Sequence, residues 1–318
     1  MPVRARAYAK INLLLAVGPR RPDGYHELLS LMQSIGLHDT LDFSFGRSDP
    51  PAGLQLRCSL PDLPRDSRNL VYRAALAFRE EYGVAEPLHV TLEKGIPLAA
   101  GLAGGSADAA ATLHALAALH EVPRDETRLA RLAARLGADV TFCLTGGTAR
   151  AEGAGERLQP LPVRPLFWLA IWKPPFAVST AEVYARLDEV RPLPQGWVLR
   201  DEAEERFAAL QEALVHEDLP ALGRFLYNDL AGVTEELYPV VRRAREAFLA
   251  AGSPGALMSG SGPTVFALAG SEVEAHRLAA AVASFPGDVF ITRTVGRGVQ
   301  LDASVRRAQK ETRASGQK

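Results

Sequence analysis

The chain has 318 residues, the length of about two ordinary domains. Its 47% hydrophobic and 23% charged residues are typical of a globular protein, and a formal net charge of −1 gives no field that recruits nucleic acid or an anionic membrane. Two cysteines without a C-x-x-C pair argue against a disulfide framework or a zinc ribbon. With no signal peptide and no apolar run of about 18 residues, we expect a cytoplasmic protein without a nucleic-acid or membrane partner.

The first half of the chain mixes strand and helix patterns. A strand is predicted over Val3–Val17, because polar and apolar residues alternate at its start and the run from Ile11 to Val17 is nearly all apolar. Further strands are expected at Asp39–Phe45, Leu54–Ser59, Leu88–Lys94 and Thr148–Glu152, and helices at Asn69–Tyr82, Ala109–Leu119 and Thr127–Leu136.

The segment Gln159–Pro165 carries three prolines, and we place the domain boundary there. The expected division is residues 1–160, residues 161–301, and a polar, basic tail at 302–318 that we expect to be disordered. The second domain is expected to contain strands at Leu166–Trp172, Val265–Ala269 and Val289–Val295, and helices at Thr180–Leu187, Glu202–Val215, Tyr238–Ala251 and Glu272–Ser284.

The stretch from Pro97 to Asp108 holds three glycines and several alanines between an expected strand and an expected helix. Such a loop leaves unpaired backbone N–H groups at the positive end of the helix dipole, where an anion binds. Small residues also let a phosphate approach the backbone closely. A tight turn before an amphipathic helix is the purely structural alternative.

The absence of several known nucleotide-binding and metal-binding motifs limits the kinds of site that this loop can form. The sequence contains no G-x-G-x-x-G, no Gly-Lys dipeptide, and neither the H-R-D nor the D-F-G motif of protein kinases. These absences disfavour a dinucleotide site and a Walker loop. The seven histidines do not cluster and none begins H-E-x-x-H, so a histidine metal site is not expected. What remains is a phosphate loop that is not of the Walker type.

Two charged residues stand in apolar surroundings. Lys10 interrupts the first strand, and Asp139 follows Gly137 next to Val140 and Phe142. A buried lysine is costly without a partner, so the two charges would offset each other's burial and could act as an acid/base pair near a phosphate. Two other interpretations remain open: Lys10 in solvent on an edge strand, and Asp139 as an ordinary turn or helix-terminus residue.

These motifs together resemble the GHMP superfamily of small-molecule kinases, which includes galactokinase, homoserine kinase and mevalonate kinase. The superfamily's ATP-phosphate loop is matched by Pro97-x-x-x-Gly101-Leu102-Ala103-Gly104-Gly105-Ser106-Ala107. Within the superfamily the chain resembles the kinases of 4-diphosphocytidyl-2-C-methyl-D-erythritol, whose Tyr-His segment is not shared by the sugar or mevalonate kinases. The segments that carry this similarity are Ala9–Leu13, Pro22–His26 with Leu28, Gly137–Val140 and Ser259–Thr264.

The resemblance implies an α+β fold of two domains with the active site in the cleft between them. The N-terminal, ribosomal-protein-S5-like domain would bind ATP and contain a left-handed β-α-β unit, against the usual handedness. The C-terminal domain would be a ferredoxin-like α/β domain whose Ser259–Thr264 loop closes the cleft. The implied reaction is phosphorylation of the substrate's 2-hydroxyl in the non-mevalonate route to isoprenoid precursors. The implied partners are this small molecule, ATP as co-substrate and Mg²⁺, and a homodimer is compatible with the sequence.

The resemblance also assigns roles to residues. Asp139 would take the proton of the hydroxyl, and Lys10 would orient Asp139 and stabilise the transferring phosphoryl group. Asn12 would bind the erythritol hydroxyls of the substrate. Tyr25 would stack on the cytosine, and His26 would hydrogen-bond to it. Tyr184 would supply a second aromatic wall and Thr180 a hydroxyl contact. ATP would be bound by Pro97, Leu98, Ala99, Ala100, Gly101, Leu102, Ala103, Gly104, Gly105, Ser106, Ala107 and Asp108, with Asn69 and Lys94 near its base and ribose.

Two features depart from the family pattern. Ala99, Ala100 and Ala103 stand where the family often has glycine, and we expect them to give a stiffer loop that still binds ATP, since alanine permits close approach where φ is negative. Asp108 stands where some relatives have Asn, and its charge would repel phosphates unless Mg²⁺ intervenes, so no metal ligand is assigned.

Two other functions stay open. The first is a GHMP kinase with a different acceptor alcohol, which has no need of Tyr25 and His26. The second is a catalytically inactive nucleotide-binding regulator, which has no need of both Lys10 and Asp139.

Overall fold

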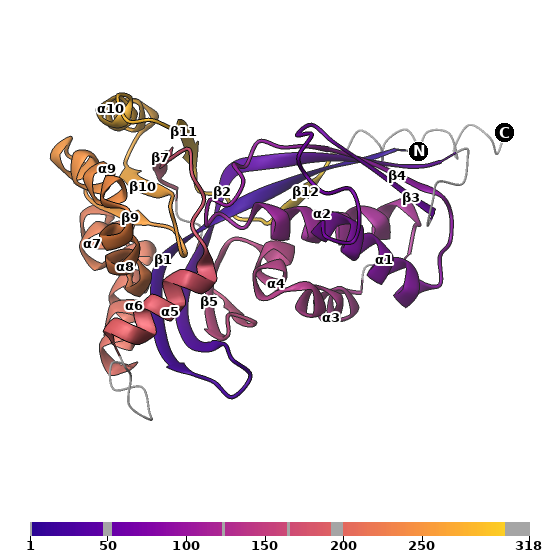
Figure 1. Cartoon of the computed structure of the whole chain (residues 1–318), viewed down its shortest axis with the longest axis horizontal. Coiled ribbons are helices and arrows are strands. Elements are labelled where there is room, and N and C mark those ends of the chain that lie inside the picture. Colours follow the sequence, from indigo (N-terminus) through magenta and orange to yellow (C-terminus); the bar gives the residue numbers. More distant parts are fainter. Residues whose placement is uncertain (1, 47–52, 123–124, 164–165, 192–199, 303–318) are drawn as a thin grey trace.

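Two very long strands form the backbone of the protein. The structure is a computed structural model that describes residues 2–46, 53–122, 125–163, 166–191 and 200–302. Strands β1 (Val3–Arg20) and β2 (His26–Phe45) pair antiparallel and run from one half of the molecule to the other (Figure 1). The sequence pattern predicted β2 only from Asp39, because most of its earlier part is buried and shows no alternation of polar and apolar residues.

The first sheet has eight strands and is built around this pair. Its main path runs in the order β12-β1-β2-β4-β3, while β5 joins β2, β6 joins β5, and β8 joins β1. The remaining strands are β3 (Leu54–Cys58), β4 (Leu88–Glu93), β5 (Thr148–Gly153), β6 (Arg157–Pro160), β8 (Tyr227–Asn228) and β12 (Val299–Leu301). Because β8 and β12 come from the second half of the sequence, the chain returns twice to the first sheet.

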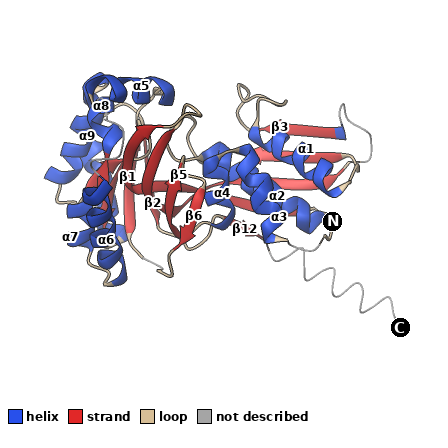
Figure 2. Cartoon of the chain, turned by 90° about the horizontal axis from the view of Figure 1, so that it is seen from below, coloured by secondary structure: helices blue, strands red, loops and turns tan. Residues whose placement is uncertain are grey.

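Four helices pack together on one side of this sheet (Figures 1 and 2). They are α1 (Leu70–Tyr82), α2 (Gly104–Leu119), α3 (Glu126–Leu136) and α4 (Ala138–Thr145). Helix α2 is the central one: almost every residue from Ala107 to Leu119 is buried, and it contacts α1, α4, β1 and β2. A helix made of alanines and leucines on all sides can be enclosed in this way.

A smaller antiparallel sheet belongs to the second half of the chain, with strand order β11-β7-β10-β9. Its strands are β7 (Trp168–Lys173), β9 (Ala256–Met258), β10 (Val265–Ala269) and β11 (Asp288–Arg293). The helices of this half are α5 (Thr180–Val190), α6 (Arg200–Val215), α7 (Leu219–Phe225), α8 (Asp229–Leu237), α9 (Pro239–Ala250) and α10 (Glu272–Val282). Helices α9 and α10 pack on this sheet, whereas α6 and α8 contact β1.

Most strands and helices agree with the sequence pattern, and the differences are mainly in short elements. Helices α4, α7 and α8 and strands β6, β8, β9 and β12 were not predicted, since segments of two to nine residues carry little periodicity. Helix α2 begins at Gly104, inside the small-residue loop, and not at Ala109. The tail expected to be disordered lies, from residue 303 on, outside the described residues. Among the helices of the described residues, none is long and apolar enough to span a membrane.

Candidate active site

A cavity of about 760 Å³ lies where the two halves of the chain meet. Its walls come from the β1–β2 hairpin, the loop before α2, the start of α4, helix α5 and the loop after β9. Of the predicted site residues, this cavity brings together Lys10, Asn12, Tyr25, His26, Gly101, Ala103, Ser106, Asp139, Thr180 and Tyr184.

Lys10 is buried on β1, with only 5% of its surface exposed. The interpretation of Lys10 as a solvated edge-strand residue is therefore wrong, and its backbone N–H donates to the Leu102 carbonyl on the side away from β2. The ammonium donates a hydrogen bond of 2.8 Å to the Asn12 side-chain oxygen. The Asn12 amide in turn donates to Ser30 Oγ at 2.8 Å, and this hydroxyl donates to the Leu14 carbonyl at 2.6 Å.

This chain of hydrogen bonds holds Lys10 and Asn12 side by side. In a strand, residues two apart point to the same face, so both side chains face the cavity. Irregularities in the β1–β2 register, between Tyr8 and Lys10 and between Asn12 and Leu14, twist the strand at this point. The polar pair therefore sits between two interruptions of the regular pairing.

Asp139 reaches the same place from the first turn of α4. Its carboxylate Oδ2 lies 3.7 Å from Lys10 Nζ, and 37% of its side chain is exposed. The N-terminus of a helix stabilises a negative charge, and Lys10 adds a full positive one. The carboxylate thus lies beside two sources of positive charge at the cavity wall and remains accessible to a ligand.

The small-residue loop ends directly in α2. No side chain caps this helix, and the first helical hydrogen bond from this end runs from Ala107 N to Ala103 O at 2.9 Å. The N–H groups of Gly104, Gly105 and Ser106 therefore lack helical acceptors, which leaves them free to bind an anion.

Two alanines of the loop adopt left-handed backbone conformations, with φ of 48° at Ala99 and 58° at Ala103. The assumption that alanine stands at negative φ in this loop is therefore wrong at these two positions. An L-residue with a Cβ is strained there by about 1–2 kcal/mol.

Gly101 brings this loop into contact with the loop after β9. Its φ is 70°, and a Cβ at this position would collide with the carbonyl oxygen of Ser259. Ser259 Oγ also donates to the Gly101 carbonyl at 3.0 Å. Asn228 holds the second loop in place by donating to the carbonyls of Met258 and Gly260, both at 2.8 Å.

Lys94 and Asp108 lie behind the loop and not in the cavity lining. The Lys94 ammonium contacts Asp39 and lies 2.8 Å from Asp108 Oδ2, and all three side chains are buried. Burial lowers the pKa of Lys94, but the charges of Asp108 and Asp39 outweigh this and raise it overall. Burial and the Asp39 charge raise the pKa of Asp108 well above its usual range. Asp108 is therefore part of a buried ionic cluster, and its side chain does not line the cavity.

Aromatic and polar side chains from the β1–β2 hairpin and α5 also line the cavity. Tyr25 is 65% exposed, whereas His26 is 7% exposed. The His26 ring lies 5.0 Å from the Tyr184 ring, and His26 Nε2 lies 2.8 Å from Asp188 Oδ1. Thr180 Oγ1 is 2.8 Å from Ser261 Oγ. Rings and hydrogen-bonding groups of this kind suit a flat, polar ligand such as a nucleobase.

Comparison with known proteins agrees with this geometry. Residues 69–147 match the family described as GHMP kinases N terminal domain, and residues 210–288 match GHMP kinases C terminal. A 4-diphosphocytidyl-2-C-methyl-D-erythritol kinase of Brevibacillus brevis is 40% identical over 296 residues, which cover 93% of this chain and 97% of the relative. One of Moorella thermoacetica is 44% identical over 289 residues, covering 91% and 98%. The chain belongs to the GHMP kinases.

Solved structures support the same fold. A crystal structure of 4-(cytidine 5'-diphospho)-2C-methyl-D-erythritol kinase superposes with a TM-score of 0.75 at 36% identity, over 92% of this chain and 99% of the other. A homoserine kinase from Cytophaga hutchinsonii superposes with the same TM-score at 20% identity, over 95% and 97%, and shows the likeness of fold alone. The expected two-domain GHMP kinase fold is thereby confirmed.

Several residues of this GHMP kinase site were not found from the sequence. Asp39, Asp188, Asn228 and Ser30 each contact a predicted site residue or its loop, although none belongs to a recognisable motif. The only available signal was a polar residue inside an apolar run, as at Ser30. Asn69, by contrast, was predicted to lie near ATP. In the structure its side chain caps α1 by accepting a hydrogen bond from Val71 N at 2.9 Å.

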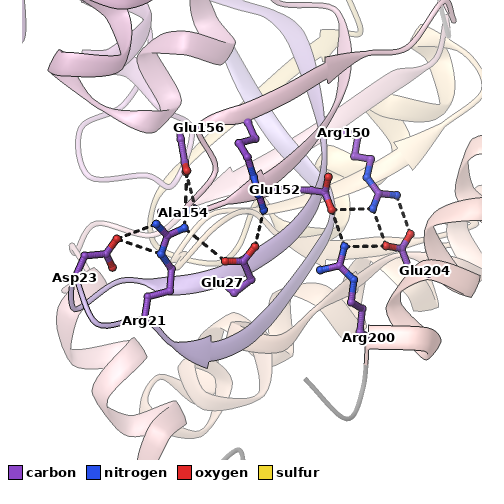
Figure 3. A network of polar contacts seen from close by, with 10 residues as sticks. Arg21, Asp23, Glu27, Arg150, Glu152, Ala154, Glu156, Arg200 and Glu204 are labelled. Carbon is purple, nitrogen blue, oxygen red and sulfur yellow. Dashed lines mark hydrogen bonds and ion pairs between the residues drawn. The ribbon is translucent and has the colours of Figure 1, made fainter. Parts of the chain in front are cut away.

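A network of ion pairs anchors the hairpin that carries Tyr25 and His26 in this GHMP kinase (Figure 3). Arg21 lies 2.9 Å from Asp23, 3.5 Å from Glu27 and 3.8 Å from Glu156. The backbone N–H of Ala154, which lines the cavity, donates to the Glu156 carboxylate at 2.6 Å. Exposed ion pairs add little stability one by one, so the effect of this network is to hold the hairpin against the β5–β6 turn.

Proposed function

We propose that this protein transfers the γ-phosphoryl group of ATP to the 2-hydroxyl of 4-diphosphocytidyl-2-C-methyl-D-erythritol, giving the 2-phosphate and ADP in the non-mevalonate route to isoprenoid precursors. One observation carries the proposal: a single cavity is lined by Lys10 and Asp139, by Ser106 of the α2 N-terminus, and by Tyr25, His26 and Tyr184. Relatives that cover more than nine-tenths of the chain bear the name of this kinase.

Asp139 acts as the base in this proposal. Phosphoryl transfer depends mainly on positioning and on electrostatic stabilisation of the charge that develops. A carboxylate at the cavity wall can accept the proton of an acceptor hydroxyl. Lys10, at 3.7 Å from that carboxylate, orients it and stabilises the transferring group.

The loop from Pro97 to Asp108 binds the phosphates of ATP in this proposal. The free N–H groups at Gly104, Gly105 and Ser106 support this role, because they point out of the positive end of a buried helix. Asn69 and Lys94 belong to the ATP side as well. A Cβ at Gly104 would lie 3.3 Å from Lys94 Nζ. A Cβ at Gly105 would lie 3.6 Å from Leu70, the residue after Asn69. Lys94 and the Asn69 segment therefore flank the first turn of α2.

The acceptor occupies the rest of the cavity. Asn12 faces it from β1 with its amide held by Lys10 and Ser30, which suits binding to the erythritol hydroxyls. The base stacks on Tyr25 and Tyr184 and bonds to His26, and Thr180 supplies a hydroxyl contact. Burial, with the charges of Asp139 and Asp229, raises the pKa of Tyr184, so this ring stays neutral beside the base.

Mg²⁺ enters with ATP in this proposal. The described residues contain no cluster of three or more His, Cys, Asp or Glu that could hold a metal. Mg²⁺ in kinases is bound mainly by substrate phosphates and water with one or two carboxylates, which fits a cavity that has Asp139 at its wall. We place the reaction in the cytoplasm, where ATP is available and where free thiols such as Cys58 and Cys143 stay reduced.

The test is ADP release with the cytidyl-erythritol substrate set against mevalonate, galactose and homoserine, using the wild type and Asp139→Asn. We expect turnover with the first acceptor only, and its loss in the variant. Turnover with another alcohol would instead indicate a GHMP kinase of different specificity. ATP binding without turnover of any acceptor would indicate a nucleotide-binding regulator.

A further inference from the structure

A carboxylate that belongs to no sequence motif holds His26 in one orientation. Asp188 projects from α5 into the cavity, and its Oδ1 lies 2.8 Å from Nε2 of His26 at the start of β2. The His26 ring is buried and is also flanked by Tyr184, one turn before Asp188 on the same helix. The ring is therefore fixed by two contacts from one helix.

The partner of Nε2 determines what the other ring nitrogen can do. An ionised carboxylate only accepts hydrogen bonds, so Nε2 must carry the proton that is donated to Asp188. In a neutral imidazole Nδ1 is then an acceptor. No other hydrogen bond of the His26 ring is found among the described residues, so Nδ1 is available to a ligand in the cavity.

An acceptor at this place distinguishes the two common pyrimidines. Cytosine presents an amino group at C4, which donates, whereas uracil presents a carbonyl oxygen there, which accepts. An imidazole nitrogen that accepts a hydrogen bond therefore binds the amino group of cytosine and repels the carbonyl oxygen of uracil.

We propose that Asp188 is the positioning residue that makes this site select a cytidyl over a uridyl substrate, by fixing the tautomer of His26. The inference rests on the proposed function, because that function places a pyrimidine base between Tyr25 and Tyr184. Asp188 itself acts through His26 and is not a catalytic residue. Removal of its charge therefore changes base selection and leaves the chemistry at Asp139 intact.

The experiment uses the full chain as wild type, Asp188→Ala, Asp188→Asn and the control Glu189→Gln. Glu189 lies on the same helix, pairs with Arg186 and does not line the cavity. The first readout is the ¹⁵N NMR spectrum of the imidazole nitrogens in the ligand-free proteins, with the His26 signals assigned through His26→Gln. We expect a protonated Nε2 and an unprotonated Nδ1 in the wild type and control, and a mixture of tautomers in both Asp188 variants.

The second readout is the ratio of kcat/KM for the cytidyl and uridyl forms of the substrate. We expect this ratio to fall at least ~tenfold in Asp188→Ala and Asp188→Asn, with KM for ATP unchanged, since a site built to bond one group rejects its analogue strongly. The asparagine variant keeps the shape of the side chain, so a merely structural role would spare its ratio. An unchanged ratio, or a protonated Nδ1 in the wild type, would overturn the proposal.

The binding of CMP and UMP separates this inference from the proposed function. If the wild type does not phosphorylate the cytidyl substrate, the proposed function fails. The tautomer of His26 and the preference for CMP over UMP then still test the role of Asp188. A preference for CMP that disappears in both Asp188 variants supports it, and equal binding of CMP and UMP by the wild type contradicts it.

Discussion

Lys10 Nζ lies 3.7 Å from Asp139 Oδ2, although the two residues belong to a sheet strand and to the first turn of a helix far along the chain. The ammonium is closer to Asn12, at 2.8 Å, than to the carboxylate. The carboxylate is therefore oriented by a positive charge without being closed off by it. This arrangement leaves Asp139 free to meet a hydroxyl proton, and it leads to the first two predictions.

Asp139→Asn should lower kcat by about 10²–10⁴, the usual contribution of a general base. Asparagine keeps the shape of the side chain but cannot take a proton, so binding of ATP and of the cytidyl substrate should persist. A coupled ADP assay measures turnover and calorimetry measures binding. Asp62→Asn, at an exposed position, is the control. Near-normal turnover in the Asp139 variant would remove the base assignment.

Lys10→Met should reduce kcat by roughly 100-fold or more, because the site loses the charge that stabilises the transferring group. The thermal midpoint should change little. The partner Asp139 is 37% exposed and water can solvate it, and a methionine fills the same volume. Activity and melting curves recorded on the same sample distinguish the two effects. A large loss of stability with unchanged kcat would mean that Lys10 is structural.

Asp108→Asn should stabilise the protein increasingly as the pH rises. The pKa of Asp108 in the folded state is raised above the ordinary value of 3.8 by burial and by Asp39. The folded protein therefore holds this proton more tightly than the unfolded chain, and the stability it contributes is present at low pH and lost as the pH rises through the folded-state pKa. One oxygen of the Asp108 carboxyl also lacks a partner among the described residues.

We expect Asp108→Asn to raise the free energy of unfolding by about 1–2 kcal/mol at high pH. At a pH near the ordinary pKa of a carboxyl group, the free energy of unfolding should hardly change. Urea unfolding at several pH values measures this. Lys94→Met is the opposing variant: it leaves Asp39 and Asp108 buried without a cation and should destabilise by about 3–5 kcal/mol. A gain for Asp108→Asn that does not vary with pH would contradict the account.

Glycine at Ala99 or Ala103 should stabilise the protein by about 1 kcal/mol each, because it removes the strain of a left-handed φ. The matched control is Ala107→Gly in the buried part of α2, where the same substitution should cost about 1 kcal/mol in helix propensity alone. Denaturant midpoints of the three variants compare the effects. Destabilisation at all three positions would show that the loop alanines are not strained.

Tyr25→Ala should raise KM for the cytidyl substrate at least tenfold, equivalent to about 1–2 kcal/mol of lost stacking. Because the ring is 65% exposed, the melting temperature should not fall. Tyr25→Phe keeps the ring and should keep KM. Steady-state kinetics at saturating ATP measures both, and an unchanged KM in the alanine variant would remove Tyr25 from the base site.

Short-range patterns in the sequence determined much of this protein. Alternation and apolar runs located most strands and helices, since they depend on neighbours within one element. The small-residue loop before a helix indicated an anion site on local grounds alone. The resemblance of five separated segments indicated the family before any distance was known.

Tertiary structure decided the rest. Only the pairing of β1 with β2 and the packing of α4 bring Lys10 near Asp139, because long-range contacts leave no periodic trace in the sequence. Local propensity disfavours a left-handed φ for alanine, so the positive φ at Ala99 and Ala103 is seen only in the folded loop. The contacts of Asp39 with Lys94 and of Asp188 with His26 join residues far apart in the chain, and only the folded protein shows that these carboxylates matter.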